Sequence, residues 1–258
     1  RLNTMLNNKT ILIAGAGGLI GRAVVKACLA QQAAVIATDL DQAKLKQLLL
    51  DDGFDLQNAK LQLATLNLQQ ADAISAVLTQ YQPDGAINCS YPRNKDYGKH
   101  FFDVSLQSFN ENLSLNLGSA FLFMQQCAAY FKQQQQPFSL VNLASVYGVV
   151  APRFDIYNNT PMTMPVEYAA IKSALVHLSK YAAAYVADSR FRVNLVSPGG
   201  ILDKQPDSFL QAYQDKTLGK GMLDPADVTG AIAFLLSDHA HFINGQNIVV
   251  DDGFTLCG

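Results

Sequence analysis

The chain has few cysteines, no long apolar run and no excess of charge of either sign. Its four cysteines (Cys28, Cys89, Cys127 and Cys257) lack the spacing of a metal site or a disulfide framework. No apolar stretch could span a bilayer, and no signal-peptide pattern opens the chain. With 19 basic and 21 acidic residues, the net charge of −2 gives no electrostatic basis for binding nucleic acid or an anionic membrane. We therefore expect a cytoplasmic protein that binds small molecules and no metal.

The alternation of short apolar runs with helix-like segments predicts an α/β fold. At 258 residues, of which 49% are hydrophobic, the chain can form one large core. We expect a single Rossmann-type domain over residues 5–258, with Met5 the natural start and residues 1–4 a remnant of expression. Its doubly wound parallel sheet of about seven strands would carry helices on both faces.

Seven apolar segments are the expected strands: Thr10–Ala14, 33–38, 61–66, 84–89, Phe138–Leu143, 191–196 and 246–251. The expected helices cover 22–30, Ala71–Tyr81, 106–132, 166–187 and 225–237.

A glycine-rich turn joins the first expected strand to the first helix. Gly15, Gly18 and Gly21 form the pattern G-x-x-G-x-x-G, directly after Thr10–Ala14. Such a turn lets the backbone approach a pyrophosphate, which then lies at the N-terminus of the helix. The pattern in this context predicts a dinucleotide site, although a merely tight turn would also use glycine.

Asp39 ends the second expected strand, 18 residues beyond Gly21. A dinucleotide-binding fold places at this point the acid that binds the ribose hydroxyls of the adenosine. A carboxylate there would repel a 2′-phosphate, so we expect NAD rather than NADP. Asp41 is the alternative, as a surface or helix-capping acid, and we expect Arg22 to be a solvated residue of the first helical turn.

Tyr168 and Lys172 stand four residues apart in a helical segment, so they project from the same face. A free phenol, with a pKa of about 10, is a poor base at neutral pH. A neighbouring ammonium favours the phenolate, and we expect Lys172 to lower the pKa of Tyr168. The pair could then exchange a proton with an alcohol or a carbonyl.

Together with the glycine turn, these residues resemble the short-chain dehydrogenase/reductase family. Ser145 follows the fifth expected strand in Asn-Leu-Ala-Ser-Val-Tyr-Gly, and Asn116 lies in the long helix in Ser-Leu-Asn-Leu-Gly. The runs 194–199 (Asn-Leu-Val-Ser-Pro-Gly) and 245–253 resemble the turn beneath the nicotinamide and the C-terminal signature of the family. The resemblance extends from Met5 to the C-terminus.

The resemblance implies a catalytic set of Asn116, Ser145, Tyr168 and Lys172. Tyr168 would be the general acid/base, Ser145 would hold the substrate oxygen, Lys172 would also bind the nicotinamide ribose, and Asn116 would hold a relay water. The implied cofactor-binding residues are Gly15, Gly18, Leu19, Ile20, Gly21, Asp39, Asn67, Leu68, Asn88, Cys89, Ser90, Tyr168, Lys172, Pro198, Gly199 and Ile201.

Four features depart from the family pattern. Leu19 stands where a glycine is usual, Asn-Cys-Ser-Tyr at 88–91 replaces Asn-Asn-Ala-Gly, and Asp203 falls where a threonine often contacts the nicotinamide amide. Ser145 and Tyr168 are also widely separated, so residues 149–165 should form an inserted loop over the substrate.

Tyr91, Arg93, Arg153 and Tyr157 are the candidate substrate-binding residues. The segments that carry them are polar and basic and lack the apolar lining that a steroid or fatty-acyl group needs. The 91–95, 162–168 and 220–225 segments resemble flagellin-modification and surface-polysaccharide oxidoreductases of bacteria. That resemblance implies a sugar phosphate or nucleotide sugar as substrate and, with the wider family, a homodimer or homotetramer.

Two alternatives remain open on the sequence. An epimerase or isomerase would retain NAD and show no net turnover of it. A non-catalytic NAD-binding regulator would have little need for all four residues of the catalytic set.

Overall fold

The computed structural model describes residues 4–256, so residues 1–3 of the expected remnant and Cys257 lie outside it. All seven strands of the described chain form one parallel sheet in the order β3-β2-β1-β4-β5-β6-β7. The strands are β1 (Thr10–Ala14), β2 (Ala34–Asp39), β3 (Leu61–Thr65), β4 (Gly85–Asn88), β5 (Phe138–Leu143), β6 (Phe191–Pro198) and β7 (Asn247–Val250). The strand order reverses between β1 and β4, where an open α/β sheet binds its ligand at the carboxyl ends of the strands. The predicted fold class is confirmed.

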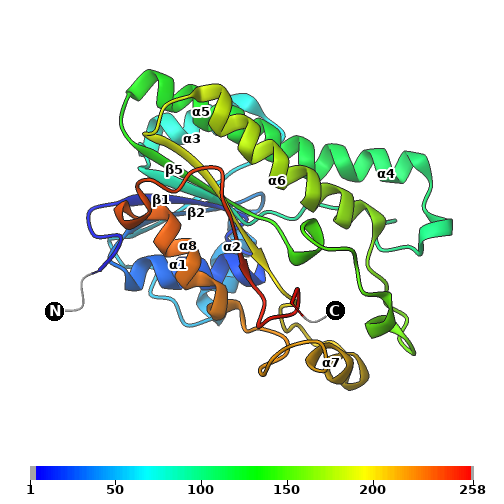
Figure 1. Cartoon of the computed structure of the whole chain (residues 1–258). Helices are drawn as coiled ribbons and strands as arrows, with labels where there is room; N and C mark the ends of the chain where they lie inside the picture. Colours follow the sequence, from blue (N-terminus) through cyan, green and yellow to red (C-terminus); the bar gives the residue numbers. More distant parts are fainter. Residues whose placement is uncertain (1–3, 257–258) are drawn as a thin grey trace.

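Helices cover both faces of this sheet (Figure 1). One face is covered by α1 (Leu19–Ala30), α2 (Gln42–Asp51) and α8 (Thr229–Leu236), and the other by α3 (Ala71–Tyr81), α5 (Ser119–Gln134) and α6 (Val166–Val186). Successive strand residues point to opposite faces and therefore enter different cores. In β1, Ile11 and Ile13 join the core beneath α1, whereas Leu12 and Ala14 join the core beneath α5.

The expected helix over 106–132 is interrupted. The structure has α4 (Leu106–Leu113), a π-helical turn η2 (Ser114–Gly118) and then α5, which runs on to Gln134. Asn116 is buried within the π-turn. Such turns insert an extra residue into a helix and are frequent at functional sites, but the apolar pattern does not reveal them.

Other differences lie at the ends of helices and in short elements. The helix expected at 22–30 begins at Leu19, and the one expected at 225–237 opens with the 3₁₀ turn η5 (Pro225–Val228), fixed by a capping box of Asp224 and Asp227. Two α-helices, α2 and α7 (Asp207–Gln214), were not among the expected helices. None of the helices in residues 4–256 is long and apolar enough to cross a membrane.

Candidate active site

The glycines of the first turn are required by close packing. Gly15 has φ +74°, and a Cβ there would lie 2.6 Å from the backbone nitrogen of Ser90, after β4. A Cβ on Gly21 would overlap the carbonyl oxygen of Gly15. The turn therefore lies against the carboxyl end of β4, and α1 begins at Leu19 with no side chain capping its N-terminus. Its free N–H groups can bind an anion such as a pyrophosphate.

Asp39 and Arg22 hold this turn from two sides. The carboxylate of Asp39 accepts the N–H of Gly17 at 2.9 Å and that of Leu40 at 2.8 Å. The guanidinium of Arg22 donates to the carbonyl oxygen of Gly17 and to Asp52, both at 2.6 Å. The expectation of a merely solvated Arg22 was therefore wrong. Asp41 caps α2 by accepting the N–H of Lys44, which leaves Asp39 as the acid beside the turn.

The other expected cofactor-binding residues also follow the carboxyl ends of strands. Asn67 and Leu68 come after β3, the residues Asn88, Cys89 and Ser90 end or follow β4, and Pro198, Gly199 and Ile201 end or follow β6. Asn88 accepts both the N–H and the hydroxyl of Ser90, which fixes the segment that packs on the glycine turn. Asp203 is exposed, and Gln205 accepts its N–H.

Ser145, Tyr168 and Lys172 converge beyond the carboxyl end of β5. Ser145 is buried and accepts the N–H of Tyr147 at 3.2 Å, and its hydroxyl is near enough to the phenol of Tyr168 to lower the pKa of that phenol. The ammonium of Lys172 donates to the carbonyl oxygen of Leu143 at 2.8 Å and lies 5.5 Å from the centre of the Tyr168 ring. The structure therefore brings three of the four expected catalytic residues together. Asn116 is buried nearby on η2, which contacts α6.

Burial acts on the ionisation of this pair in opposite directions. It raises the pKa of Tyr168, which the hydrogen bond with Ser145 partly opposes, and it lowers the pKa of Lys172 to about 8. A buried site disfavours whichever form is charged. The expectation that Lys172 lowers the pKa of Tyr168 is not met, because burial raises this pKa and the group that opposes the rise is Ser145.

Tyr91 forms an aromatic wall beside this group. Its ring lies edge-on to Tyr168, with centroids 5.6 Å apart, and its hydroxyl is hydrogen-bonded to that of Tyr97. The ammonium of Lys172 lies 5.6 Å from the centre of the Tyr91 ring, and the guanidinium of Arg93 lies 5.1 Å from it. Arg93 is exposed, so it can meet a ligand that enters beside Tyr91.

Two residues of this region were not singled out from the sequence. Tyr97 could have been found only through its contact with Tyr91. Glu167, directly before Tyr168, is fully buried, and neither of its carboxylate oxygens has a hydrogen-bond partner in the described chain. An acid in the first turn of a helix is usually explained by the helix dipole, so Glu167 does not stand out in the sequence.

Arg153 and Tyr157 lie in a different environment from the one we expected. The guanidinium of Arg153 donates to the carbonyl oxygen of Phe254 at 2.9 Å and stacks 4.9 Å from its ring. Tyr157 packs against Phe209 of α7, with centroids 5.1 Å apart. Both side chains therefore pack between neighbouring segments of the chain, and these contacts do not place them in an open cleft.

The 149–165 segment is also less polar than expected. It contributes an apolar cluster, next to Tyr168, that also includes residues of α7 and of the C-terminal segment. Its members from the segment are Val150, Ile156, Tyr157, Met162 and Met164.

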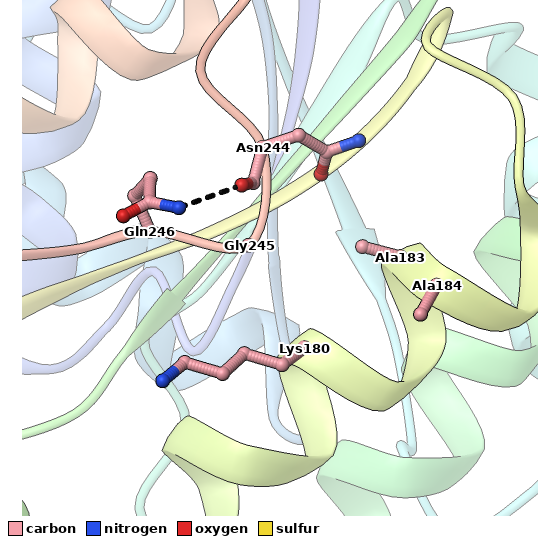
Figure 2. A pocket seen from close by; sticks show the side chains of 6 residues that line it. All are labelled: Lys180, Ala183, Ala184, Asn244, Gly245 and Gln246. Atoms are coloured by element: carbon pink, nitrogen blue, oxygen red, sulfur yellow. Dashed lines mark hydrogen bonds between the residues drawn. The ribbon is translucent and has the colours of Figure 1, made fainter.

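A hollow lined by Lys180, Ala183, Ala184 and residues 244–246 lies away from Tyr168 (Figure 2). Residues 244–246 precede β7, so it opens at the amino ends of the strands, opposite to Tyr168. Lys180 is also twelve residues beyond Tyr168, or about 18 Å along α6. Part of its lining is tied by a hydrogen bond from Gln246 to the carbonyl oxygen of Asn244.

The fold and the site define a dinucleotide-binding α/β protein with the proton-transfer groups of an oxidoreductase. Comparison with known proteins agrees. Residues 15–255 match a family model described as enoyl-(acyl carrier protein) reductase. "Post-translational flagellin modification protein A" of Campylobacter coli is 38% identical over 98% of this chain and all of its own length. A 7α-hydroxysteroid dehydrogenase of Bacteroides fragilis is 29% identical over 96% of this chain and 95% of its own.

Among solved structures, a short-chain dehydrogenase of Leptospira borgpetersenii with bound NAD⁺ superposes with a TM-score of 0.84. It is 30% identical, and the match covers 99% of this chain and 96% of that one. The chain belongs to the short-chain dehydrogenase/reductase family. It is thus an oxidoreductase for CH–OH groups of small molecules with a nicotinamide cofactor, and the resemblance to flagellin-modification oxidoreductases is confirmed.

Proposed function

We propose that the protein uses NAD to interconvert a secondary alcohol and a ketone on a polar sugar that carries a phosphate or nucleotide. The observation that carries the proposal is the exposed guanidinium of Arg93, stacked on Tyr91 beside Tyr168. A cation next to the proton-transfer group suits an anionic substituent of the substrate. The flagellin-modification protein of Campylobacter coli supports the same class, because flagellin modification is the role in its name. The pathway we propose is bacterial surface-glycan synthesis, in the cytoplasm.

Asp39 supports NAD over NADP. Its carboxylate is fixed beside the glycine turn by the N–H groups of Gly17 and Leu40. A fixed negative charge at the adenosine ribose accepts hydrogen bonds from hydroxyls and repels a 2′-phosphate. A Cβ on Gly17 would lie 2.9 Å from the Asp39 carboxylate, so the glycine allows this carboxylate to lie against the turn.

In the proposed mechanism, Ser145 and Tyr168 hold the substrate oxygen by hydrogen bonds. NAD, when bound, supplies the hydride-transfer chemistry. During oxidation Tyr168 would take the proton of the substrate hydroxyl, and during reduction it would give a proton to the oxygen of the new alcohol. Lys172 stays bonded to Leu143 and orients the ribose, and Asn116 holds a water that exchanges the proton with solvent. The 149–165 segment covers the substrate.

The test is to follow nicotinamide absorbance while NAD or NADP is offered with sugar phosphates and nucleotide sugars. We expect turnover with NAD that falls at least about a hundredfold in Tyr168→Phe. Asp39→Ser should raise the ratio of NADP to NAD activity at least about tenfold. Bound NAD without net turnover across the panel would contradict the proposal and favour an enzyme that retains its cofactor.

We also propose a homodimer or homotetramer packed through α4, α5 and α6. Phe121 on α5 and Tyr181 and Tyr185 on α6 are exposed large side chains, as an interface of these helices requires. Light scattering behind a sizing column should give two or four times the chain mass of 28.0 kDa. A monomer would contradict the proposal.

A further inference from the structure

Tyr213 of α7 is bonded to the turn that follows β6. Its hydroxyl accepts the N–H of Gly200 at 2.5 Å. A Cβ on Gly199 would lie 2.9 Å from that hydroxyl oxygen, and a Cβ on Gly200 would lie 2.9 Å from the Tyr213 ring. The backbone of this turn therefore rests directly on Tyr213, with no side chain between them.

The same ring begins a column of aromatic residues that leads to Ser145. Tyr213 stacks on Phe254, with centroids 4.5 Å apart and an interplanar angle of 9°. Phe254, which is fully buried, meets the edge of Tyr147 at 5.9 Å. The backbone N–H of Tyr147 in turn donates to the hydroxyl of Ser145.

The column itself is held in place by polar contacts. Arg153 stacks on Phe254 and bonds to its carbonyl oxygen. Asp251 accepts the N–H groups of Gly253 and Thr255, which closes the turn around Phe254. Three segments far apart in the sequence (145–153, 199–213 and 251–255) thus form one packed unit. Close-packed groups of this kind transmit a displacement instead of absorbing it.

We infer that Tyr213 is a positioning residue, which fixes the 198–200 turn relative to Ser145 through its hydroxyl and its stacked ring. The inference rests on the proposed function, in which Ser145 holds the substrate oxygen, and on the family resemblance, which implies that this turn lies beneath the nicotinamide. Tyr213 then sets the distance between the hydride acceptor and the reacting carbon. Since hydride transfer requires close contact of the reacting atoms, a small displacement of the turn lowers the rate.

The test is Tyr213→Phe in the full chain, which keeps the stacked ring and removes only the acceptor of the Gly200 N–H. We expect amide exchange at Gly200 to accelerate about tenfold, because its hydrogen bond is lost. We also expect kcat to fall about tenfold while the KM for NAD and for the sugar changes less than about threefold. The emission of bound NADH should shift as the nicotinamide moves.

The control is Tyr81→Phe, which removes a hydroxyl from the last residue of α3, just before the amino end of β4 and outside the proposed subunit interface. It should change none of these readouts. Unchanged Gly200 exchange, kcat and NADH emission in Tyr213→Phe would overturn the inference and leave the proposed function intact. Wild-type protein that binds neither NAD nor NADH would overturn the proposed function and this inference with it.

Discussion

Burial of the Lys172 side chain lowers the free energy of unfolding by an amount that depends on pH. Its pKa is lowered from 10.5 to about 8 by burial, so between these values the unfolded chain binds more protons than the folded one. The free energy of unfolding contributed by this group therefore rises with pH across that window, by roughly 3 kcal/mol in total. Below pH 8 both states are protonated, and the full cost of burying the ammonium is present.

Lys172→Met removes this dependence. The free energy of unfolding of wild type minus that of the variant should increase between pH 8 and 10, because only the wild type loses a buried charge. Urea unfolding at several pH values measures the difference. Lys180→Met, on the exposed side of the same helix, is the matched control. The free energy of unfolding of wild type minus that of this control should stay constant between pH 8 and 10. A constant difference for Lys172→Met would contradict the lowered pKa.

The raised pKa of Tyr168 makes the two directions of the reaction respond differently to pH. Alcohol oxidation needs the phenolate, so its kcat/KM should rise about tenfold per pH unit from neutral into alkaline pH. Carbonyl reduction uses the protonated phenol and should be flat around neutral pH. Initial rates from pH 6 to 10 in both directions test this. An oxidation plateau already present at pH 7 would show instead that the phenol's pKa is lowered.

At this scale the sequence predicted residues whose partners are local. The spacing of Tyr168 and Lys172 on one helix put them on one face, whereas Ser145 was found from the family resemblance of the run that follows the fifth expected strand. The role of Arg153 could not be predicted, because its partner Phe254 is 101 residues away. The burial that raises the pKa of Tyr168 also comes from non-local packing, so the spacing of Tyr168 and Lys172 alone did not predict the direction of that shift.

At the scale of the elements, the contact that Arg22 makes between α1 and the end of α2 has a consequence for cofactor binding. Arg22 of α1 bridges Gly17 of the glycine turn and Asp52 at the end of α2. Arg22→Met should lower the free energy of unfolding by about 1–2 kcal/mol and weaken NAD binding several-fold, because the turn loses one of its two supports. Urea unfolding and titration with NADH measure these effects.

Lys26→Met, one turn further along α1 on an exposed position, is the control and should leave both values unchanged. If Arg22→Met binds NADH as tightly as the wild type does, the prediction is wrong. The glycine turn then keeps its shape without Arg22, and the contact with Asp52 contributes only to the free energy of unfolding.

The strands and long helices were predictable, because each shows its own apolar pattern. The short helix α7 was not, since its buried residues Phe209 and Tyr213 pack against Tyr157 and Phe254 from distant segments. α2 has a capping acid, Asp41, but its many polar residues hide a narrow buried stripe of Leu45 and Leu49. The π-turn at Asn116 changes hydrogen bonding without changing the pattern.

For the molecule as a whole, the proposed cofactor should stabilise the folded state. A ligand at a hundred times its Kd adds about 2.7 kcal/mol to the free energy of unfolding. For a chain of this size that corresponds to a rise in Tm of roughly 5–10 °C. Thermal melts with NAD should show this rise in Tm, and the same concentration of NADP should give a smaller rise. Equal shifts would contradict the role proposed for Asp39.

The place of Phe254 in the aromatic column also has a consequence for synthesis of the protein on the ribosome. All seven strands and every residue of the expected catalytic set are translated before Phe254. Chains are made at about 5–20 residues per second, and their N-terminal parts can fold first. A nascent chain can thus begin to form the sheet from β1 to β6 while β7 and Phe254 are still in the ribosome, so that the faces of Tyr147 and Tyr213 lack their partner. Catalytic competence would then appear only after the 251–256 segment has emerged from the exit tunnel.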